Sequence, residues 1–180
     1  DSRLTPTSES TDLVLRPYFV TGTQIGVALG TTYIGATFPI TRNCSFVNLY
    51  MRVTAGTLGS VVRVTLYQQA AGGSGVQALV ATGSYTLPGA GGQDIVVPIV
   101  GSMKSGICSV LVGIDSGSAS VGVHTSAALD GYNQNVPATK APTNFTTAIT
   151  VNNTPPATFN PVSDATAATS DTALLLRVGA

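Results

Sequence analysis

The sequence is poor in charge, and this shortage excludes several classes of protein. Only 9% of the 180 residues are charged, and eight basic side chains balance eight acidic ones. A soluble domain ordinarily carries about 25% charged residues. A chain this neutral has no basic surface to bind nucleic acid and no charged tail. Its mean hydropathy of +0.33 is also too high for a wholly disordered chain.

Side chains that carry chemistry are scarce as well. The chain has two cysteines, Cys44 and Cys108, and a single histidine, His124. These make neither a disulfide framework nor a zinc set, so we expect both thiols to be reduced and to lie in apolar strands. A Ser-His-Asp triad would need His124, which we expect to face solvent, and the Gly-x-Ser-x-Gly elbow is absent.

Carboxylates occur singly, beside turns, where an aspartate accepts hydrogen bonds from backbone N–H groups. These residues are Asp94, Asp115, Asp130, Asp164 and Asp171. A calcium site would have to combine Asp115 or Asp130 with backbone carbonyls, because no Asp-rich calcium loop is present. We therefore expect no enzyme, no cofactor and no metal.

Long apolar runs and helical periodicity are also missing, so we expect no membrane-spanning segment. What the chain does have is 20 glycines and 10 prolines between short segments rich in valine and threonine. That pattern predicts an antiparallel β-sandwich with almost no helix. A jelly roll of eight strands in two sheets is the favoured form, and an immunoglobulin-like sandwich is the alternative, although the chain has no tryptophan for its core. The predicted strands are 13–21, 32–40, 45–54, 60–69, 76–87, 94–100, 107–115, 119–128, 148–151 and 172–178.

Strict alternation is clearest in 45–54 and 60–69, which we predict to form a β-hairpin through the glycine-bearing loop between them. Arg63, Thr65 and Tyr67 should then face solvent. Pro98 indicates an edge strand. The predicted core is Val47, Leu49, Met51, Val53, Val62, Val64, Leu66, Val110, Val112 and Ile114.

Two segments lack the periodicity of strands. Residues 1–12 are polar and are expected to be a flexible arm on a single domain, 13–180. Residues 129–171 are expected to be a long irregular loop before the last strand, 172–178. Within that loop, an aromatic ring next to amides suits a sugar, although an ordinary polar loop is the more common meaning of such a segment. The candidate glycan or partner contacts are Asp130, Tyr132, Asn133, Gln134 and Asn135.

One stretch resembles a known family. In TYIGATFPITRNCSFVNLYMRVTAGTLGSVVRVTLYQQ, the Phe38-Pro39 strand is followed by the alternating Val47–Val53 strand, a glycine hairpin and the Val62–Leu66 strand. This order resembles jelly-roll modules in structural proteins of tailed bacteriophage virions, and the closing ALLLRV strand is similar too. The resemblance implies a role in capsid decoration, a head fibre or a tail fibre, with no catalytic residues.

Two functions therefore remain open. The first is a non-enzymatic virion structural protein, located at the virion surface, whose partners are capsid or other virion proteins. Sixteen charges are few for an isolated surface, so we expect a homo-oligomer, with a trimer as the first expectation, built through residues 1–12 and 136–171. The alternative is a glycan- or receptor-binding sandwich of a fibre or an extracellular protein.

Overall fold

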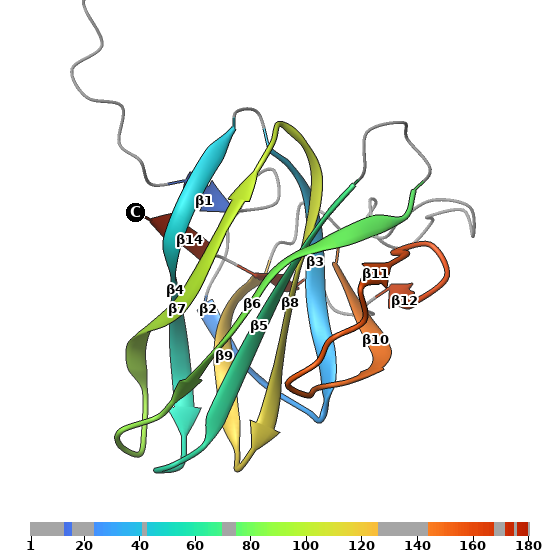
Figure 1. The fold of residues 1–180 in the computed structure, drawn as a ribbon. Coiled ribbons are helices and arrows are strands. Elements are labelled where there is room, and N and C mark those ends of the chain that lie inside the picture. The colour runs from blue at the N-terminus through green and yellow to red at the C-terminus, as the bar shows by residue number, and fades with distance from the viewer. Residues whose placement is uncertain are drawn as a thin grey trace, which may run out of the picture.

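The computed structural model describes residues 13–15, 24–40, 43–69, 75–125, 144–167, 172–174 and 176–179. Every element in these ranges is a β-strand, and every pairing between them is antiparallel. The predicted all-β antiparallel sandwich is confirmed (Figure 1). In the described part of the chain, no helix is long and apolar enough to cross a membrane.

The strands form two seven-stranded sheets, here called sheet A and sheet B. Sheet A contains β1 (Leu13–Leu15), β2 (Gln24–Ala28), β4 (Cys44–Gly56), β7 (Gln93–Met103), β9 (Ala119–Thr125), β13 (Thr172–Leu174) and β14 (Leu176–Gly179). Sheet B contains β3 (Thr32–Ile40), β5 (Val61–Gln69), β6 (Gln77–Thr86), β8 (Gly106–Ser116), β10 (Asn144–Thr150), β11 (Thr158–Phe159) and β12 (Ala165–Ala167).

The eight strands from β2 to β9 pair in a definite order. In sheet A the order is β2-β9-β4-β7, and in sheet B it is β3-β8-β5-β6. Six of the seven connections cross between sheets, and only β5 to β6 stays within one. This is the strand order of a jelly roll. Strand β7 pairs with β4 alone among the described strands, which confirms the edge position that Pro98 indicates.

The predicted hairpin between 45–54 and 60–69 is wrong. β4 pairs with β7, β9 and β14, whereas β5 pairs with β6 and β8, so the two strands lie in different sheets. Their apolar faces meet across the sandwich instead of lying side by side. Alternation of apolar and polar residues shows which face of a strand is buried, but not which strand lies beside it. A short loop with glycines can connect strands in two different sheets as well as two neighbours in a hairpin.

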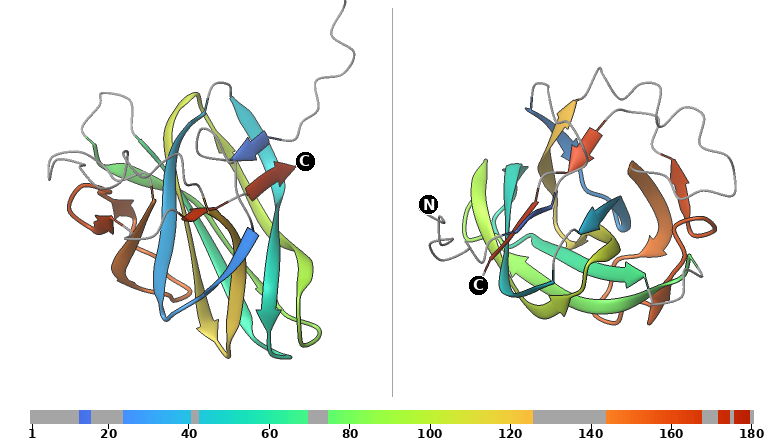
Figure 2. Two further views of the ribbon diagram at one scale, coloured as in Figure 1. Left: turned by 180° about the vertical axis from the view of Figure 1, so that it is seen from behind. Right: turned by 90° about the horizontal axis from the view of Figure 1, so that it is seen from above.

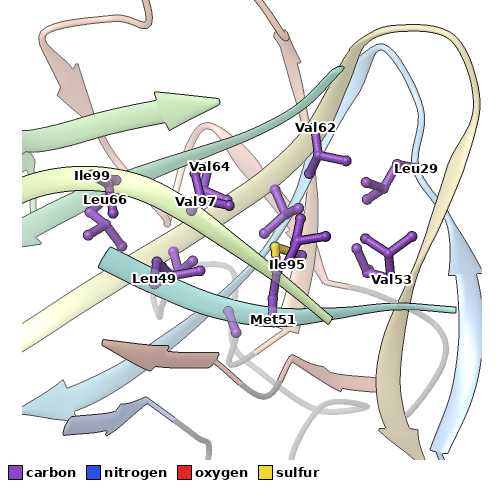
Figure 3. Close-up of a cluster of buried hydrophobic side chains, with 14 of the residues drawn as sticks. Leu29, Leu49, Met51, Val53, Val62, Val64, Leu66, Ile95, Val97 and Ile99 are labelled. Carbon is purple, nitrogen blue, oxygen red and sulfur yellow. The ribbon is translucent and has the colours of Figure 1, made fainter. Parts of the chain in front are cut away.

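The main core fills the space between the sheets (Figure 3). Nine of the ten predicted core residues are buried in it: Leu49, Met51, Val53, Val62, Val64, Leu66, Val110, Val112 and Ile114. Val47 is the exception, with 45% of its surface exposed. The register with β7 shifts between Phe46 and Asn48, so this β-bulge turns Phe46 into the core and Val47 outward.

The prediction that Arg63, Thr65 and Tyr67 face solvent is also wrong, because all three are buried. They lie on the face of β5 that points away from sheet A. A second cluster of buried residues covers this face: Tyr33, Tyr67, Leu111, Phe145, Val151 and Phe159. Strands β5 and β8 of sheet B therefore have a core on each side. Seen from above, sheet B curls toward its end strands β10 and β12 (Figure 2).

Other differences concern the ends of the chain. β10, β11 and β12 lie inside 129–171, where the sequence predicts no regular structure, apart from the short strand 148–151. Strand β2 was not predicted, and the predicted closing strand appears as β13 and β14. The arm 1–12 and residues 126–143 lie outside the described residues.

We predict that Leu49→Ala lowers the free energy of unfolding by about 2–5 kcal/mol, because it leaves a cavity in the main core. Val47→Ala, two residues away on the same strand, should change it by less than about 0.5 kcal/mol, because that side chain faces out. Chemical denaturation of both variants measures the difference. Equal losses would mean that the bulge at Phe46 is misplaced.

Candidate functional site

The second cluster is built around three aromatic rings from three strands. Tyr67 of β5 and Phe159 of β11 have ring centroids 5.4 Å apart, and Phe145 of β10 lies 5.5 Å from Phe159. Offset rings at this separation attract each other in addition to burying apolar area. Phe159 therefore packs β11, an end strand of sheet B, against the outward face of β5 in the same sheet.

Residues 144–167 carry β10 to β12 and are here called the covering segment. Two glycines, on β3 and β8, allow this segment to approach those strands closely. A Cβ on Gly35 would lie 2.5 Å from the ring of Phe145, and one on Gly113 would lie 2.2 Å from the side chain of Val151. Both contacts are closer than real carbon atoms come, so any side chain here would push the cover away. Glycine is thus needed at these two positions for the covering segment to pack against β3 and β8.

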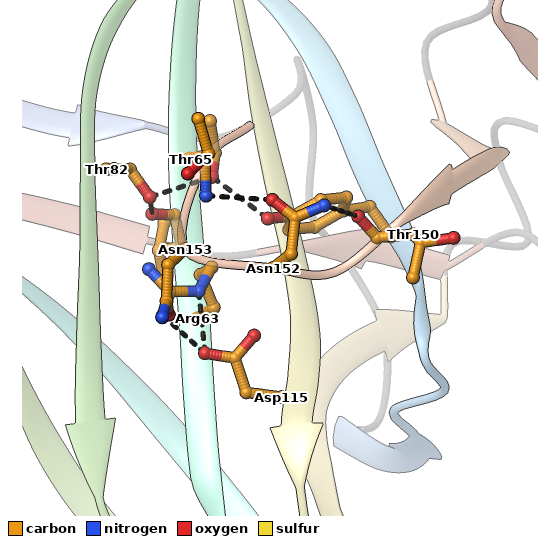
Figure 4. A network of polar contacts seen from close by, with 10 residues as sticks. Arg63, Thr65, Thr82, Asp115, Thr150, Asn152 and Asn153 are labelled. Carbon is orange, nitrogen blue, oxygen red and sulfur yellow. Dashed lines mark hydrogen bonds and ion pairs between the residues drawn. The ribbon is translucent and has the colours of Figure 1, made fainter. Parts of the chain in front are cut away.

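A polar network ties the same segment down at its start (Figure 4). Arg63 on β5 donates from Nε to Asp115 Oδ2 on β8 at 2.7 Å, and its Nη2 donates to the same oxygen and to the side-chain oxygen of Asn153. The guanidinium thus joins two strands to the covering segment. Asp115 Oδ1 is buried and has no hydrogen-bond partner among the described residues.

Tyrosine hydroxyls continue the fastening along the segment. Tyr67 donates to the backbone carbonyl of Pro156 at 2.8 Å, and Tyr33 bonds Thr65 and the backbone of Asn152. Burial raises the pKa of the Tyr67 phenol well above its usual range, and nearby Tyr33 and Asp164 raise it further. Burial also raises the pKa of Tyr33. Both phenols therefore stay protonated at neutral pH, and Tyr67 keeps the proton with which it bonds Pro156.

The connection between β11 and β12 is a tight turn held by its own side chains. The backbone N–H of Asn160 donates to Asp164 Oδ2 at 2.8 Å, and the Ser163 hydroxyl donates to Asp164 Oδ1 at 2.8 Å. The Asn160 side chain in turn accepts from the N–H of Val162. The Asp164 carboxylate is therefore held in one orientation although it is exposed.

A groove with a volume of about 400 Å³ opens beside this carboxylate. It lies beside β10, β11 and β12. Its apolar lining residues are Ala148, Ile149 and Pro156, and its polar lining residues are Thr158, Ser163, Asp164 and Thr166. Each carboxylate oxygen has a lone pair left after its one bond within the turn.

The groove can donate and accept hydrogen bonds and can pack against apolar atoms. Asp164 is the one charged residue among its described lining residues, and its carboxylate disfavours anions and accepts hydrogen bonds. It holds neither a histidine nor a cysteine that could act as a nucleophile or base. In the described part of the chain, no three His, Cys, Asp or Glu residues come together in a way that could hold a metal ion.

The residues singled out from sequence fall in different places. Asp130, Tyr132, Asn133, Gln134 and Asn135 lie outside the described residues, so that site remains a prediction. Asp115 accepts from Arg63, which also donates to Asn153, and Asp94 pairs with Arg52. Cys44 and Cys108 form no disulfide, and burial raises the pKa of the Cys108 thiol. His124 lies on β9.

The groove was missed because its polar residues are ordinary turn residues in the sequence. One signal could have indicated the cover over sheet B. Residues 61–66 and 107–114 are apolar or small at nearly every position, which is typical of strands buried on both faces. Such strands require a second covering layer, and the only long segment left over was the supposed loop 129–171.

Comparison with known proteins identifies no family. No protein-family model matches the chain, and no curated protein does. Among solved structures, one match is titled as the cysteine protease and lectin-like domains of Cwp84, a surface layer associated protein of Clostridium difficile. The identity is 16% and the TM-score is 0.46. The match covers 96% of this chain and 37% of that one.

We predict that Asp115→Asn lowers the free energy of unfolding by about 3 kcal/mol, because it leaves the buried Arg63 guanidinium without its counter-charge. Asp94→Asn is the matched control. It removes the same kind of partner from Arg52, but that pair is exposed, with side chains 44% and 81% accessible, so the loss should stay below about 1 kcal/mol. Urea denaturation compares the two, and a loss at Asp94 as large as that at Asp115 would contradict the account.

Proposed function

We propose that this chain is a non-enzymatic carbohydrate-binding β-sandwich module, and that the groove along β10 to β12 holds a neutral saccharide. One observation carries the proposal: an oriented carboxylate, three hydroxyl-bearing residues and three apolar residues line the same open groove. A sugar has the matching character, because its hydroxyls donate and accept in fixed directions while its C–H faces are apolar.

The way the groove is built supports binding over catalysis. The aromatic rings and the Arg63 network fix the groove to sheet B, so little chain entropy is lost when a ligand binds. Catalysis of glycoside hydrolysis would need a second carboxylate opposite Asp164. No second carboxylate lines this groove among the described residues.

The test is a glycan array of neutral and acidic saccharides, followed by calorimetric titration of the best ligand against Asp164→Asn. We expect binding to neutral saccharides and an affinity at least about tenfold lower in the variant, the loss expected for a hydrogen bond to a charged group. Asp94→Asn, on sheet A, should bind like the parent chain. Equal affinity of the Asp164 variant and the parent would contradict the groove as the site.

Tyr132→Ala separates this groove from the site predicted from sequence. If the ligand sits along β10 to β12, the Tyr132 variant keeps its affinity. If the affinity falls in the Tyr132 variant and not in the Asp164 variant, the sugar binds through residues 130–135 and the groove is excluded.

A virion structural protein is the second candidate, and a different observation favours it. Val47, Val96 and Val100 are exposed on sheet A, and only 9% of the chain is charged, which suits a surface covered by neighbouring subunits. The resemblance to jelly-roll proteins of tailed bacteriophages supports the same role.

Co-sedimentation with tailed-bacteriophage capsids tests this second candidate. The chain should pellet with the capsids, and deletion of residues 1–12 should weaken pelleting while the circular dichroism spectrum stays the same, because the predicted core lies outside the arm. A chain that stays in the supernatant with every capsid tested would remove its support.

A further inference from the structure

The turn between β11 and β12, residues 160–164, uses every one of its backbone N–H groups within itself. The N–H of Asn160 donates to Asp164 Oδ2, and that of Val162 donates to the Asn160 side chain. The N–H groups of Ser163 and Asp164 both donate to the Asn160 carbonyl, at 3.1 and 2.8 Å. Pro161 has no N–H. The Ser163 hydroxyl has one proton, and it donates this proton to Asp164 Oδ1.

The two turn residues that line the groove can therefore only accept hydrogen bonds from a ligand. They are Ser163 and Asp164, and the carboxylate and hydroxyl oxygens keep lone pairs after their bonds within the turn. The other carboxylates that the structure describes, Asp94 and Asp115, are each paired with an arginine. Asp164 forms no ion pair with a described residue, so its charge is available to a ligand.

An acceptor-only surface determines which ligand groups fit against it. A carboxylate or sulfate on a sugar would bring a like charge, and no proton would lie between it and Asp164. A hydroxyl fits, because its proton can point at the carboxylate. Thr158 and Thr166 also line the groove, and their hydroxyls can donate as well as accept. They can therefore bond the ligand's acceptors, whereas Ser163 and Asp164 cannot.

The carboxylate has two oxygens, and this number indicates how many hydroxyls it can hold. One carboxylate can accept two donors side by side, as it does from the fork of an arginine. Hydroxyls on adjacent ring carbons of a sugar are also two donors side by side. Each oxygen of Asp164 is already held by one bond within the turn. The pair of acceptors is therefore oriented before a ligand arrives, which lowers the entropy cost of binding.

We infer that Asp164 selects saccharides through two hydroxyls on adjacent ring carbons, each of which donates to one carboxylate oxygen. The inference rests on the proposed function and names the part of the sugar that the groove recognises. A saccharide is rejected where either of the two positions carries a group that cannot donate.

Deoxyfluoro sugars test this inference, because fluorine replaces a hydroxyl at similar size but has no proton to donate. The probes are the methyl glycosides of glucose, galactose and mannose, titrated calorimetrically into the full chain. The glycoside that binds most tightly is then replaced by each of its monodeoxyfluoro derivatives. Two neighbouring positions should each lower the affinity by at least about tenfold, the loss expected for a hydrogen bond to a charged group. The remaining positions should change it much less.

Two variants show whether those hydroxyls meet the carboxylate. In Asp164→Asn one of the two oxygens becomes an amide group that donates, so the losses at the two positions should shrink. Thr166→Val is the matched control, because it removes a polar group from the same groove and leaves the carboxylate in place. Its overall affinity can fall, but both tenfold losses should remain. Circular dichroism and melting of both variants check that the fold is kept.

The outcomes separate this inference from the proposed function. If Asp164→Asn weakens binding but the fluorinated glycosides show one sensitive position, two non-adjacent ones or none, the inference is overturned and the groove remains the site. Losses that persist unchanged in Asp164→Asn would overturn it as well. If none of the three glycosides binds, or if Asp164→Asn binds them like the parent chain, the proposed function itself is contradicted.

Discussion

The central strands of sheet B, β5 and β8, have to bury both of their faces, and the rest of the structure follows from that requirement. In β5 the residues Val62, Val64 and Leu66 pack against sheet A, while Thr65 and Tyr67 between them are just as buried on the other side. β8 has the same pattern: Val110 and Val112 lie in the main core, and Leu111 between them lies in the second cluster on the other face of the strand. A strand with this pattern is stable only if a second layer covers it.

Sheet B supplies that cover itself: its end strands β10, β11 and β12 carry the residues that pack on the outer face of β5 and β8, and the candidate groove lies beside them. Phe145 and Phe159 fill the apolar half of the second core, and Arg63 with Asp115 and Asn153 satisfies the polar half. The groove opens beside the cover's strands and turn. The Asp164 carboxylate that lines it is oriented by hydrogen bonds within the turn, from the N–H of Asn160 and the hydroxyl of Ser163.

Much of the fold could be predicted from the sequence, for an identifiable reason. Period-two alternation in β4 located Leu49, Met51 and Val53, and the turn residues located most strand ends. Alternation could not show that β4 and β5 lie in different sheets, because it carries no information about neighbours. It also misplaced Val47, because a bulge shifts the register without leaving a mark in composition.

The candidate groove could not be predicted, because its parts have meaning only in three dimensions. Thr158, Ser163 and Asp164 are common turn residues, and nothing in their spacing points to Ile149 on the facing strand. The buried Arg63 was a clearer sign. Its isolated charge on an otherwise apolar strand requires a partner, and the partners, Asp115 and Asn153, come from positions far along the chain.

Native-state hydrogen exchange tests most directly whether residues 144–167 belong to the core. The amide of Val151 donates to the carbonyl of Thr31 at 2.8 Å, and the amide of Leu79 donates to that of Ala157 at 2.9 Å, so both report on the cover. If sheet B depends on its second layer, these two amides should open with the same free energy as those in the middle of β5. Exchange at the rate of an unstructured peptide, while β5 stays protected, would contradict the account.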